Sequence, residues 1–248
     1  MTDPGWQRIG PDLRIKAWAD AALPVAVAAI ADSDAPWRCG GTWFVGVDAL
    51  PNDPSGAVAG TPFPWAALPL LPEPLHCAQL STLRPGYPQP SPDETPAAFR
   101  FRQIRDAAHL DGLLPIGPDK RRMLKEPHAW ILGIALNACD ARSSPLTVWE
   151  GSHRIIKAAL TAALRPYPPG TWADIDLTEP YQMARKKVFD TCPRILLPIQ
   201  PGEATLLHRH TIHGVAPWEP GAKAPSPGRI IAYLRPHMQN VQGWLTQP

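Results

Sequence analysis

The sequence lacks an excess of charge of either sign. Of its 248 residues, 24 are Lys or Arg and 22 are Asp or Glu, so the formal net charge is +2, and only 19% of the residues are charged. Proteins that bind nucleic acid or anionic membranes usually carry enough basic residues to shift this balance. The composition therefore argues against both kinds of partner.

A long apolar run is also missing. The longest one, Ala21–Ala31, is interrupted by Pro24, and it falls well short of the roughly 20 residues that a helix needs to span a bilayer. Its last residues, Ala29-Ile30-Ala31, imitate a signal-peptide cleavage site, but the segment before them has no basic excess. We therefore expect neither a membrane span nor secretion.

Paired cysteines are missing as well. The four cysteines, Cys39, Cys77, Cys139 and Cys192, are far apart, and none has the C-x-x-C spacing of a zinc or thiol-exchange site. Isolated thiols are typical of a reducing compartment. We expect a cytoplasmic protein without a disulfide framework.

Proline, in contrast, is abundant. The 33 prolines are more than twice the usual share of about 5%, which predicts short elements joined by long ordered loops. No linker cuts the chain, so residues 1–248 are expected to form a single domain. Residues 1–98 are predicted to be a helical and loop-rich cover. It contains the Ala-rich segment Pro11–Asp32, expected as helical pieces broken at Pro24 because proline removes a helical N–H.

Short strands are predicted from runs rich in β-branched and aromatic residues. They are Thr42–Val47, Ala78–Leu83, Phe99–Ala107, Ala129–Ala138, Leu146–Trp149, Ala204–His208 and Arg229–Leu234. Two helices are expected between them, one at Ile155–Leu164 with Ser152 as its N-cap and one at Pro180–Phe189.

The candidate chemistry begins at the H-x-D pair His109 and Asp111, directly after the run Phe99–Ala107. Residues i and i+2 of an extended segment point to the same side, so an imidazole and a carboxylate can converge on one ion. By the same parity Gln103 is expected on that side. The pair is short enough to occur by chance, so it needs a third ligand from elsewhere in the chain.

Histidines about a hundred residues later offer that ligand. The segment Gly202–Gly214 ends in three of them, His208, His210 and His213. Two histidines and one carboxylate on one face of an octahedron leave the opposite face open, which is the arrangement of non-haem Fe(II) oxygenases.

A buried cation is predicted on the last strand. Alternation puts Arg229, Ile231, Tyr233 and Arg235 on one face. A guanidinium inside a barrel needs an anionic partner, and its planar fork matches a carboxylate, which a cosubstrate acid can supply. Arg229 and Arg235 are both candidates for this role, and we expect Arg235, nearer the strand exit, to be a surface salt-bridge partner.

Together these residues resemble the phytanoyl-CoA dioxygenase-like family of Fe(II)/2-oxoglutarate-dependent oxygenases. The resemblance covers residues 99–236. Three pieces carry it in the order of the family, namely His109-x-Asp111, then the segment Pro145–Arg154 with its Gly-Ser-His sequence, then His213-Gly214 with Arg229.

The resemblance implies a mainly β protein with flanking helices, built on a double-stranded β-helix (a jelly-roll, cupin-like barrel) at residues 99–236. It implies that His109, Asp111 and His213 are the catalytic metal ligands for Fe(II). Arg229, assisted by Gln103, is then expected to bind 2-oxoglutarate. The implied reaction uses oxygen to hydroxylate a small organic substrate and releases succinate and carbon dioxide.

Two alternatives remain open at this point. His208 and His210 have the H-x-H spacing of a cupin-like metalloprotein that does not use 2-oxoglutarate, although we expect His208 in the core and His210 in a loop near the mouth. A non-catalytic β-helix binding domain is the other alternative, because Val215 stands where the family commonly has Ser or Thr, and Pro217–Gly228 is a long insert. The substrate and the oligomeric state are not indicated.

Overall fold

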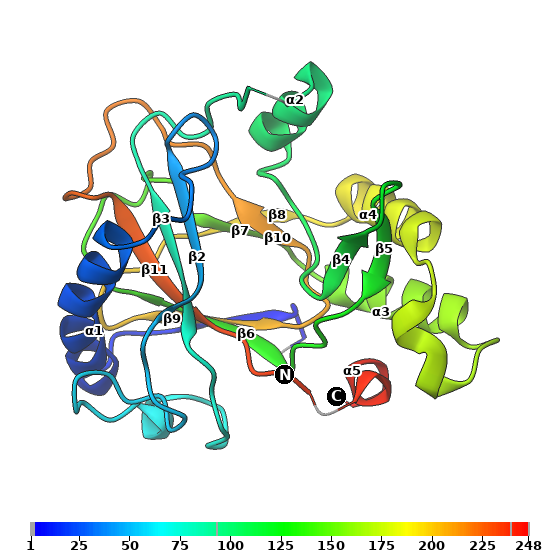
Figure 1. Ribbon diagram of the computed structural model, residues 1–248, viewed down its shortest axis with the longest axis horizontal. Helices are drawn as coiled ribbons and strands as arrows, with labels where there is room; N and C mark the ends of the chain where they lie inside the picture. Colours follow the sequence, from blue (N-terminus) through cyan, green and yellow to red (C-terminus); the bar gives the residue numbers. More distant parts are fainter. Residues whose placement is uncertain (1–2, 93, 239, 248) are drawn as a thin grey trace.

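The computed structural model describes residues 3–92, 94–238 and 240–247. Two antiparallel sheets face one another and helices lie outside them (Figure 1). The larger sheet has the order β1-β9-β6-β11-β3-β2, the smaller has the order β10-β7-β8, and β4 and β5 form a separate ribbon. No described helix is long and apolar enough to cross a membrane.

The strands are short, as the proline content predicts. Those of the larger sheet are β1 (Trp6–Ile9), β2 (Trp43–Leu50), β3 (Ala78–Leu83), β6 (Trp130–Ala135), β9 (Ala204–His208) and β11 (Arg229–Leu234). The others are β4 (Leu113–Ile116), β5 (Arg121–Leu124), β7 (Leu146–Trp149), β8 (Arg194–Leu197) and β10 (His213–Val215). Four predicted strands, namely β3, β7, β9 and β11, have the predicted bounds, and the ends of β2 and β6 differ from the predicted ones by one residue at the start and three at the end.

The helices are α1 (Leu13–Ala31), α2 (Pro96–Ile104), α3 (Ser152–Leu164), α4 (Thr178–Thr191) and α5 (Val241–Thr246), with two 3₁₀ segments at Trp65–Ala67 and Pro169–Asp174. The two predicted helices are present as α3 and α4. The predicted cap of α3 is wrong by one residue, because Gly151 is the N-cap at φ 79°. The hydroxyl of Ser152 instead accepts a hydrogen bond from the backbone N–H of Ile212 at 2.9 Å.

The prediction that Pro24 breaks the first helix is wrong, since α1 continues through it. The helix is capped by Asp12, which accepts from the N–H of Arg14, and it buries Trp18 and several small residues against the outer face of the larger sheet. Burying this face stabilises the helix by more than the lost backbone hydrogen bond costs.

Residues 1–98 are more than a cover. They supply β1, β2 and β3 to the larger sheet, where β3 pairs with β11 and β1 pairs with β9. The core is therefore built from both ends of the chain, and residues 99–236 do not contain all of it.

The prediction of a strand at Phe99–Ala107 is also wrong. These residues belong mostly to α2, whose N-cap Thr95 accepts from the N–H of Ala98 and whose first turn contains Pro96. Alternating aromatic residues suggested a strand, whereas the Thr-Pro start favours a helix. Gln103 is consequently an exposed residue of α2.

The alternation predicted for β11 is confirmed, and it positions the interior. Ile230, Ala232 and Leu234 join the core beneath α1, whereas Ile231 and Tyr233 join the core between the two sheets. Every second side chain from Arg229 to Arg235 therefore points into the space between the two sheets.

Candidate metal centre

The backbone brings the H-x-D segment onto the end of the smaller sheet. The N–H of His109 donates to the carbonyl of His213 at 2.9 Å, and the N–H of His213 donates back to the carbonyl of His109 at 3.1 Å. His213 begins β10, which pairs with β7. This bridge places two histidines that are far apart in sequence side by side, with ring centroids 4.6 Å apart.

The turn before His109 is held by two further contacts. The carbonyl of Asp106 accepts from the N–H of Val215 at 2.8 Å, and the buried carboxylate of Asp106 forms an ion pair with Arg194 of β8. Gly214 lies against this turn, since a Cβ atom there would collide with the Asp106 carbonyl oxygen. The glycine that follows His213 is therefore required by the close approach of the two segments.

Three side chains converge as the sequence predicts. The Nε2 atom of His109 lies 3.2 Å from Oδ1 of Asp111, and Nε2 of His213 lies 3.8 Å from the same oxygen. One ligand atom from each residue lies within 4.8 Å of the others, and among the described residues this is the one group of three that could hold a metal ion.

Backbone carbonyls orient both imidazoles. Nδ1 of His109 is 3.0 Å from the carbonyl of Ala107, and Nδ1 of His213 is 3.0 Å from the carbonyl of Thr211. A carbonyl only accepts, so each Nδ1 carries a proton and each Nε2 points at the group. Burial lowers the pKa of His109, but the hydrogen bond from its Nε2 to Asp111 more than offsets this, so the pKa lies above its ordinary value. A metal ion would displace the Nε2 proton and take up the lone pair. Two imidazole nitrogens and one carboxylate oxygen are donors that suit Fe(II) and leave coordination positions open.

The charges of the group favour an ionised ligand set. Burial alone would raise the pKa of Asp111, but the hydrogen bond from His109 and the charges of His213 and Arg235 hold it well below its ordinary value. Burial, together with the charge of the neighbouring His109, lowers the pKa of His213 to about 4. Asp111 is therefore an anion, and His213 is a neutral ligand at ordinary pH.

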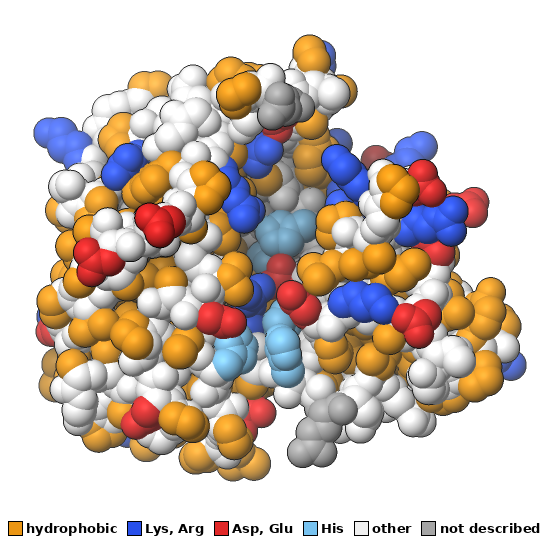
Figure 2. Space-filling model, in the orientation of Figure 1, with side chains coloured by type: hydrophobic (Ala, Val, Ile, Leu, Met, Phe, Trp, Pro, Cys, Tyr) orange, Lys and Arg blue, Asp and Glu red, His pale blue; other side chains and the backbone are white. Residues whose placement is uncertain are grey.

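The group opens into a cavity of about 170 Å³ between β2, β3, β10 and β11. Figure 2 shows histidine side chains at the bottom of a hollow in this face of the molecule. Gln79 of β3 and Arg235 line the cavity together with the three candidate ligands. Sequence reasoning missed Gln79, because nothing in its local sequence marks it.

The prediction that Arg235 is a surface residue is wrong. Its side chain is 11% exposed, and its Nη1 lies 3.2 Å from Oδ2 of Asp111. Its Nη2 donates to Oε1 of Gln79 at 2.8 Å. Arg235 thus holds the carboxylate oxygen that faces away from the two histidines, which leaves Oδ1 for a metal ion.

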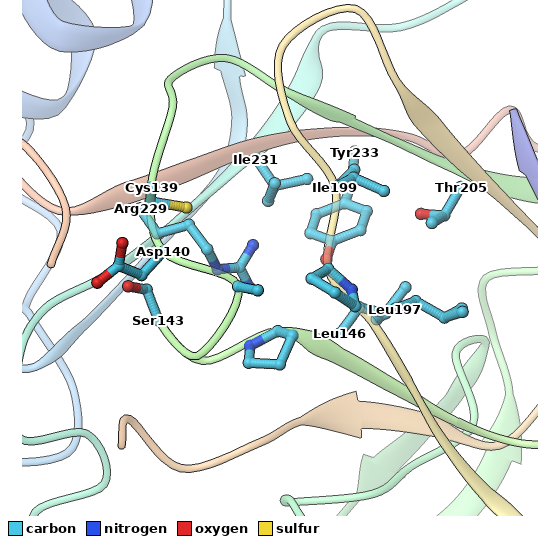
Figure 3. Close-up of a pocket in the computed structure, with 13 residues that line it drawn as sticks. Cys139, Asp140, Ser143, Leu146, Leu197, Ile199, Thr205, Arg229, Ile231 and Tyr233 are labelled. Carbon is cyan, nitrogen blue, oxygen red and sulfur yellow. The ribbon is translucent and has the colours of Figure 1, made fainter. Parts of the chain in front are cut away.

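Arg229 occupies a second, narrower space deeper between the sheets. Figure 3 shows Arg229 and Tyr233 reaching toward one another from β11. The space there is about 10 Å³, enough for about one water molecule. Leu146 and Tyr233 line this space and also the cavity of the metal centre, so the two adjoin.

The guanidinium of Arg229 lacks an anionic partner. The residue is 5% exposed, its Nη2 donates to the carbonyl of Ser144 at 2.6 Å, and its Nε has no hydrogen-bond partner. Among the described residues, no carboxylate lies within salt-bridge distance of it. A buried cation without a counter-ion fits the carboxylate of an anionic ligand.

Three other histidines and Gln103 lie outside this site. His208 and His210 are buried, and their rings form a row with His153 on one side and Trp244 on the other. The expectation that His208 is a core residue is confirmed, but His210 is fully buried and not at a mouth. Gln103, on exposed α2, lines neither space, so its predicted role in binding a cosubstrate is wrong.

No family model matches this sequence, and no curated protein matches it. Several solved structures are similar to this one in fold. The non-heme alpha ketoglutarate dependent carbocyclase SnoK from nogalamycin biosynthesis is 14% identical with a TM-score of 0.45, over 97% of this chain and 85% of that one. AviO1 from Streptomyces viridochromogenes Tue57 is 15% identical with a TM-score of 0.43, over 95% and 91%. EctD from S. alaskensis with bound Fe is 14% identical with a TM-score of 0.43, over 94% and 72%.

Proposed function

We propose that this protein is an Fe(II)- and 2-oxoglutarate-dependent dioxygenase that hydroxylates a small organic substrate and releases succinate and carbon dioxide. One observation carries the proposal. The ligand atoms of His109, Asp111 and His213 converge within 4.8 Å, next to a space where the buried Arg229 has no carboxylate partner among the described residues. We also propose that the two facing sheets form the double-stranded β-helix of such enzymes. The proposed location of the protein is the cytoplasm.

Each residue has a defined task in this proposal. His109, Asp111 and His213 hold the metal, and Arg229 binds the distal carboxylate of 2-oxoglutarate through its planar fork. Arg235 keeps one oxygen of Asp111 occupied. Oxygen is the oxidant, and iron and 2-oxoglutarate, when bound, would activate it, which the side chains alone cannot do; one oxygen atom enters succinate and the other enters the substrate. The cavity walls position one C–H bond of the substrate near the metal and keep water away from it.

The test is an anaerobic titration of metal-free protein with Fe(II) and then with 2-oxoglutarate. The expected result is a weak visible charge-transfer band that appears only with both present. His109→Ala and Asp111→Ala should each lose stoichiometric iron and the band, whereas His153→Ala, which changes a histidine outside the site, should keep both.

Each alternative has its own outcome. Stoichiometric iron without the band favours a cupin-like metalloprotein that does not use 2-oxoglutarate. Absence of iron binding favours a non-catalytic binding domain. Unchanged iron stoichiometry in both ligand variants contradicts the assignment of the metal centre.

A further inference from the structure

A second cavity, of about 440 Å³, adjoins the cavity of the metal centre at Arg235, which lines both. We call it the vestibule. The polar residues that line it are Asp48, His76, Glu126, His128 and His237. Figure 2 shows histidine side chains flanked by acidic ones beside the hollow on this face.

The backbone of Arg235 fixes the orientation of one imidazole in the vestibule. Nδ1 of His128 is 3.1 Å from the carbonyl oxygen of Arg235. Because the carbonyl accepts, Nδ1 carries the proton and Nε2 keeps its lone pair. Burial, together with the charge of Arg235, lowers the pKa of His128 to about 4, so the ring is neutral.

That lone pair has no donor. Nε2 of His128 is buried and without a hydrogen-bond partner, and the residue is 2% exposed. Oε2 of Glu126, which is also an acceptor, lies 3.6 Å from it, on a side chain that is 39% exposed. The buried Nε2 needs a donor, since a buried unpaired acceptor costs about 1–3 kcal/mol, and a donor placed between the two atoms would serve both.

On the side of Glu126 the vestibule favours a cation, because the guanidinium of Arg235 on its inner wall is already paired with Asp111. Asp48 is paired with His76, whose Nδ1 lies 2.7 Å from Oδ1 of Asp48. Glu126 has no lysine or arginine within salt-bridge distance among the described residues, since Lys125 beside it pairs with Asp174. Glu126 is therefore an uncompensated carboxylate opposite a neutral imidazole.

The strand β2 is distorted where it borders the vestibule. Its register with β3 shifts between Gly46 and Leu50, and Asp48 adopts φ 53°. A bulge re-aims the side chain that it carries and is over-represented next to binding sites, while a non-glycine residue at positive φ persists only where its surroundings hold it. This bulge directs the carboxylate of Asp48 to the vestibule.

We propose that the vestibule binds a protonated amine of the substrate, with the ammonium group between Glu126 and Nε2 of His128. The N–H groups satisfy both acceptors, and the positive charge compensates Glu126. A hydroxyl group would bring a donor but no charge. A metal ion would find only these two ligand atoms, because the described residues bring three together only at His109, Asp111 and His213.

This assignment of an amine-bearing substrate rests on the proposed oxygenase function, but the amine site can be tested without it. Full-length metal-free protein with ¹³C-labelled histidine is titrated with 1,4-diaminobutane, with 1,4-butanediol as its neutral counterpart, and with Zn(II). The ring resonance of His128 is assigned from the spectrum of His128→Gln. Saturable shifts of His128 with the diamine are expected, together with an affinity at least tenfold weaker in Glu126→Gln and unchanged in Asp119→Asn, an exposed carboxylate of the β4–β5 turn.

Each other outcome overturns the amine assignment. Equal shifts with the diol indicate recognition of a hydroxyl group. Shifts of His128 with Zn(II) but not with the diamine indicate a second metal site. A diamine affinity unaffected by Glu126→Gln, or no shift of His128 with any probe, shows that the vestibule is not an ammonium site. The band with iron and 2-oxoglutarate should persist in Glu126→Gln, so failure here is distinguishable from failure of the oxygenase proposal.

Discussion

Replacing Arg229 with methionine separates a cosubstrate-binding role from a structural one, because the two roles predict opposite effects. Methionine has a similar length and no charge. If Arg229 binds the distal carboxylate of 2-oxoglutarate, Arg229→Met should weaken 2-oxoglutarate binding severely. It should also leave the metal-free protein as stable as before, since the guanidinium has no carboxylate partner among the described residues.

The magnitudes follow from burial. Arg229 is 5% exposed, and removing one partner of a buried, hydrogen-bonded charge pair costs about 2–5 kcal/mol. At about 1.4 kcal/mol per factor of ten, the Kd for 2-oxoglutarate should rise by roughly 30-fold to 5,000-fold. In the metal-free protein the variant loses the bond to the Ser144 carbonyl, worth about 1 kcal/mol, and also removes an uncompensated buried charge. The free energy of unfolding should therefore fall by no more than about 1 kcal/mol, and an increase agrees with the reasoning as well.

Two measurements on the same variants decide the matter. The Kd comes from anaerobic titration of the iron-loaded protein with 2-oxoglutarate, and the free energy of unfolding comes from urea denaturation of the metal-free protein. Arg100→Met, an exposed arginine of α2, is the matched control and should change neither. A variant that loses several kcal/mol of stability while its Kd stays unchanged would refute the reasoning, because Arg229 would then be a structural residue.

Three further changes have clear expected outcomes. Gly214→Ala should push the Asp106 turn away from β10 and lower iron affinity at least tenfold, measured by metal titration; unchanged affinity would show that this close approach does not matter. Arg235→Met frees Oδ2 of Asp111 and should weaken Co(II) binding by about 10-fold to 100-fold, whereas an effect below twofold would contradict its positioning role. Burial keeps the pKa of His210 well below its ordinary value, so the folded state keeps this ring neutral while the unfolded chain takes up a proton below about pH 6.5. The free energy of unfolding should therefore fall by about 2 kcal/mol between neutral pH and pH 5. His210→Phe should remove this loss, measured by urea denaturation at neutral pH and at pH 5, and an unchanged acid sensitivity of the variant would refute the assignment.

The parts of the site that the sequence predicted share one property, which is local spacing. The H-x-D pair and the alternation along β11 are set by backbone geometry within a few residues. A facial triad needs one more donor, but the choice of His213 among three nearby histidines came from the resemblance to the oxygenase family. These residues do converge in the structure.

The wrong predictions arose where residue spacing was interpreted for a strand that is not present, or was not followed beyond the end of a strand. The role of Gln103 depended on a strand at Phe99–Ala107, and its parity lost meaning once those residues formed α2. Arg235 was placed at the surface because it follows the last strand residue, although its parity with Arg229 already pointed inward. The strand β10 has only three residues, too few for a period to be recognised.

The vestibule could not be predicted in this way, because its polar residues come from four separate segments of the chain. Tertiary packing alone brings them together. Sequence motifs identify ligands that lie on one or two segments, whereas a binding pocket for the rest of a substrate is assembled from loops.

The metal centre and the vestibule both contain histidines oriented by a backbone carbonyl, but the two sites suit different ligands. In each of His109, His213 and His128, Nδ1–H donates a hydrogen bond to a backbone carbonyl, so that Nε2 is the nitrogen directed at the site. At the metal centre two such nitrogens meet the carboxylate of Asp111, which suits a metal ion. In the vestibule one such nitrogen faces the single carboxylate of Glu126, which suits a charged hydrogen-bond donor instead. The number of acceptors that converge, and not their chemical type, therefore separates the two predicted ligands.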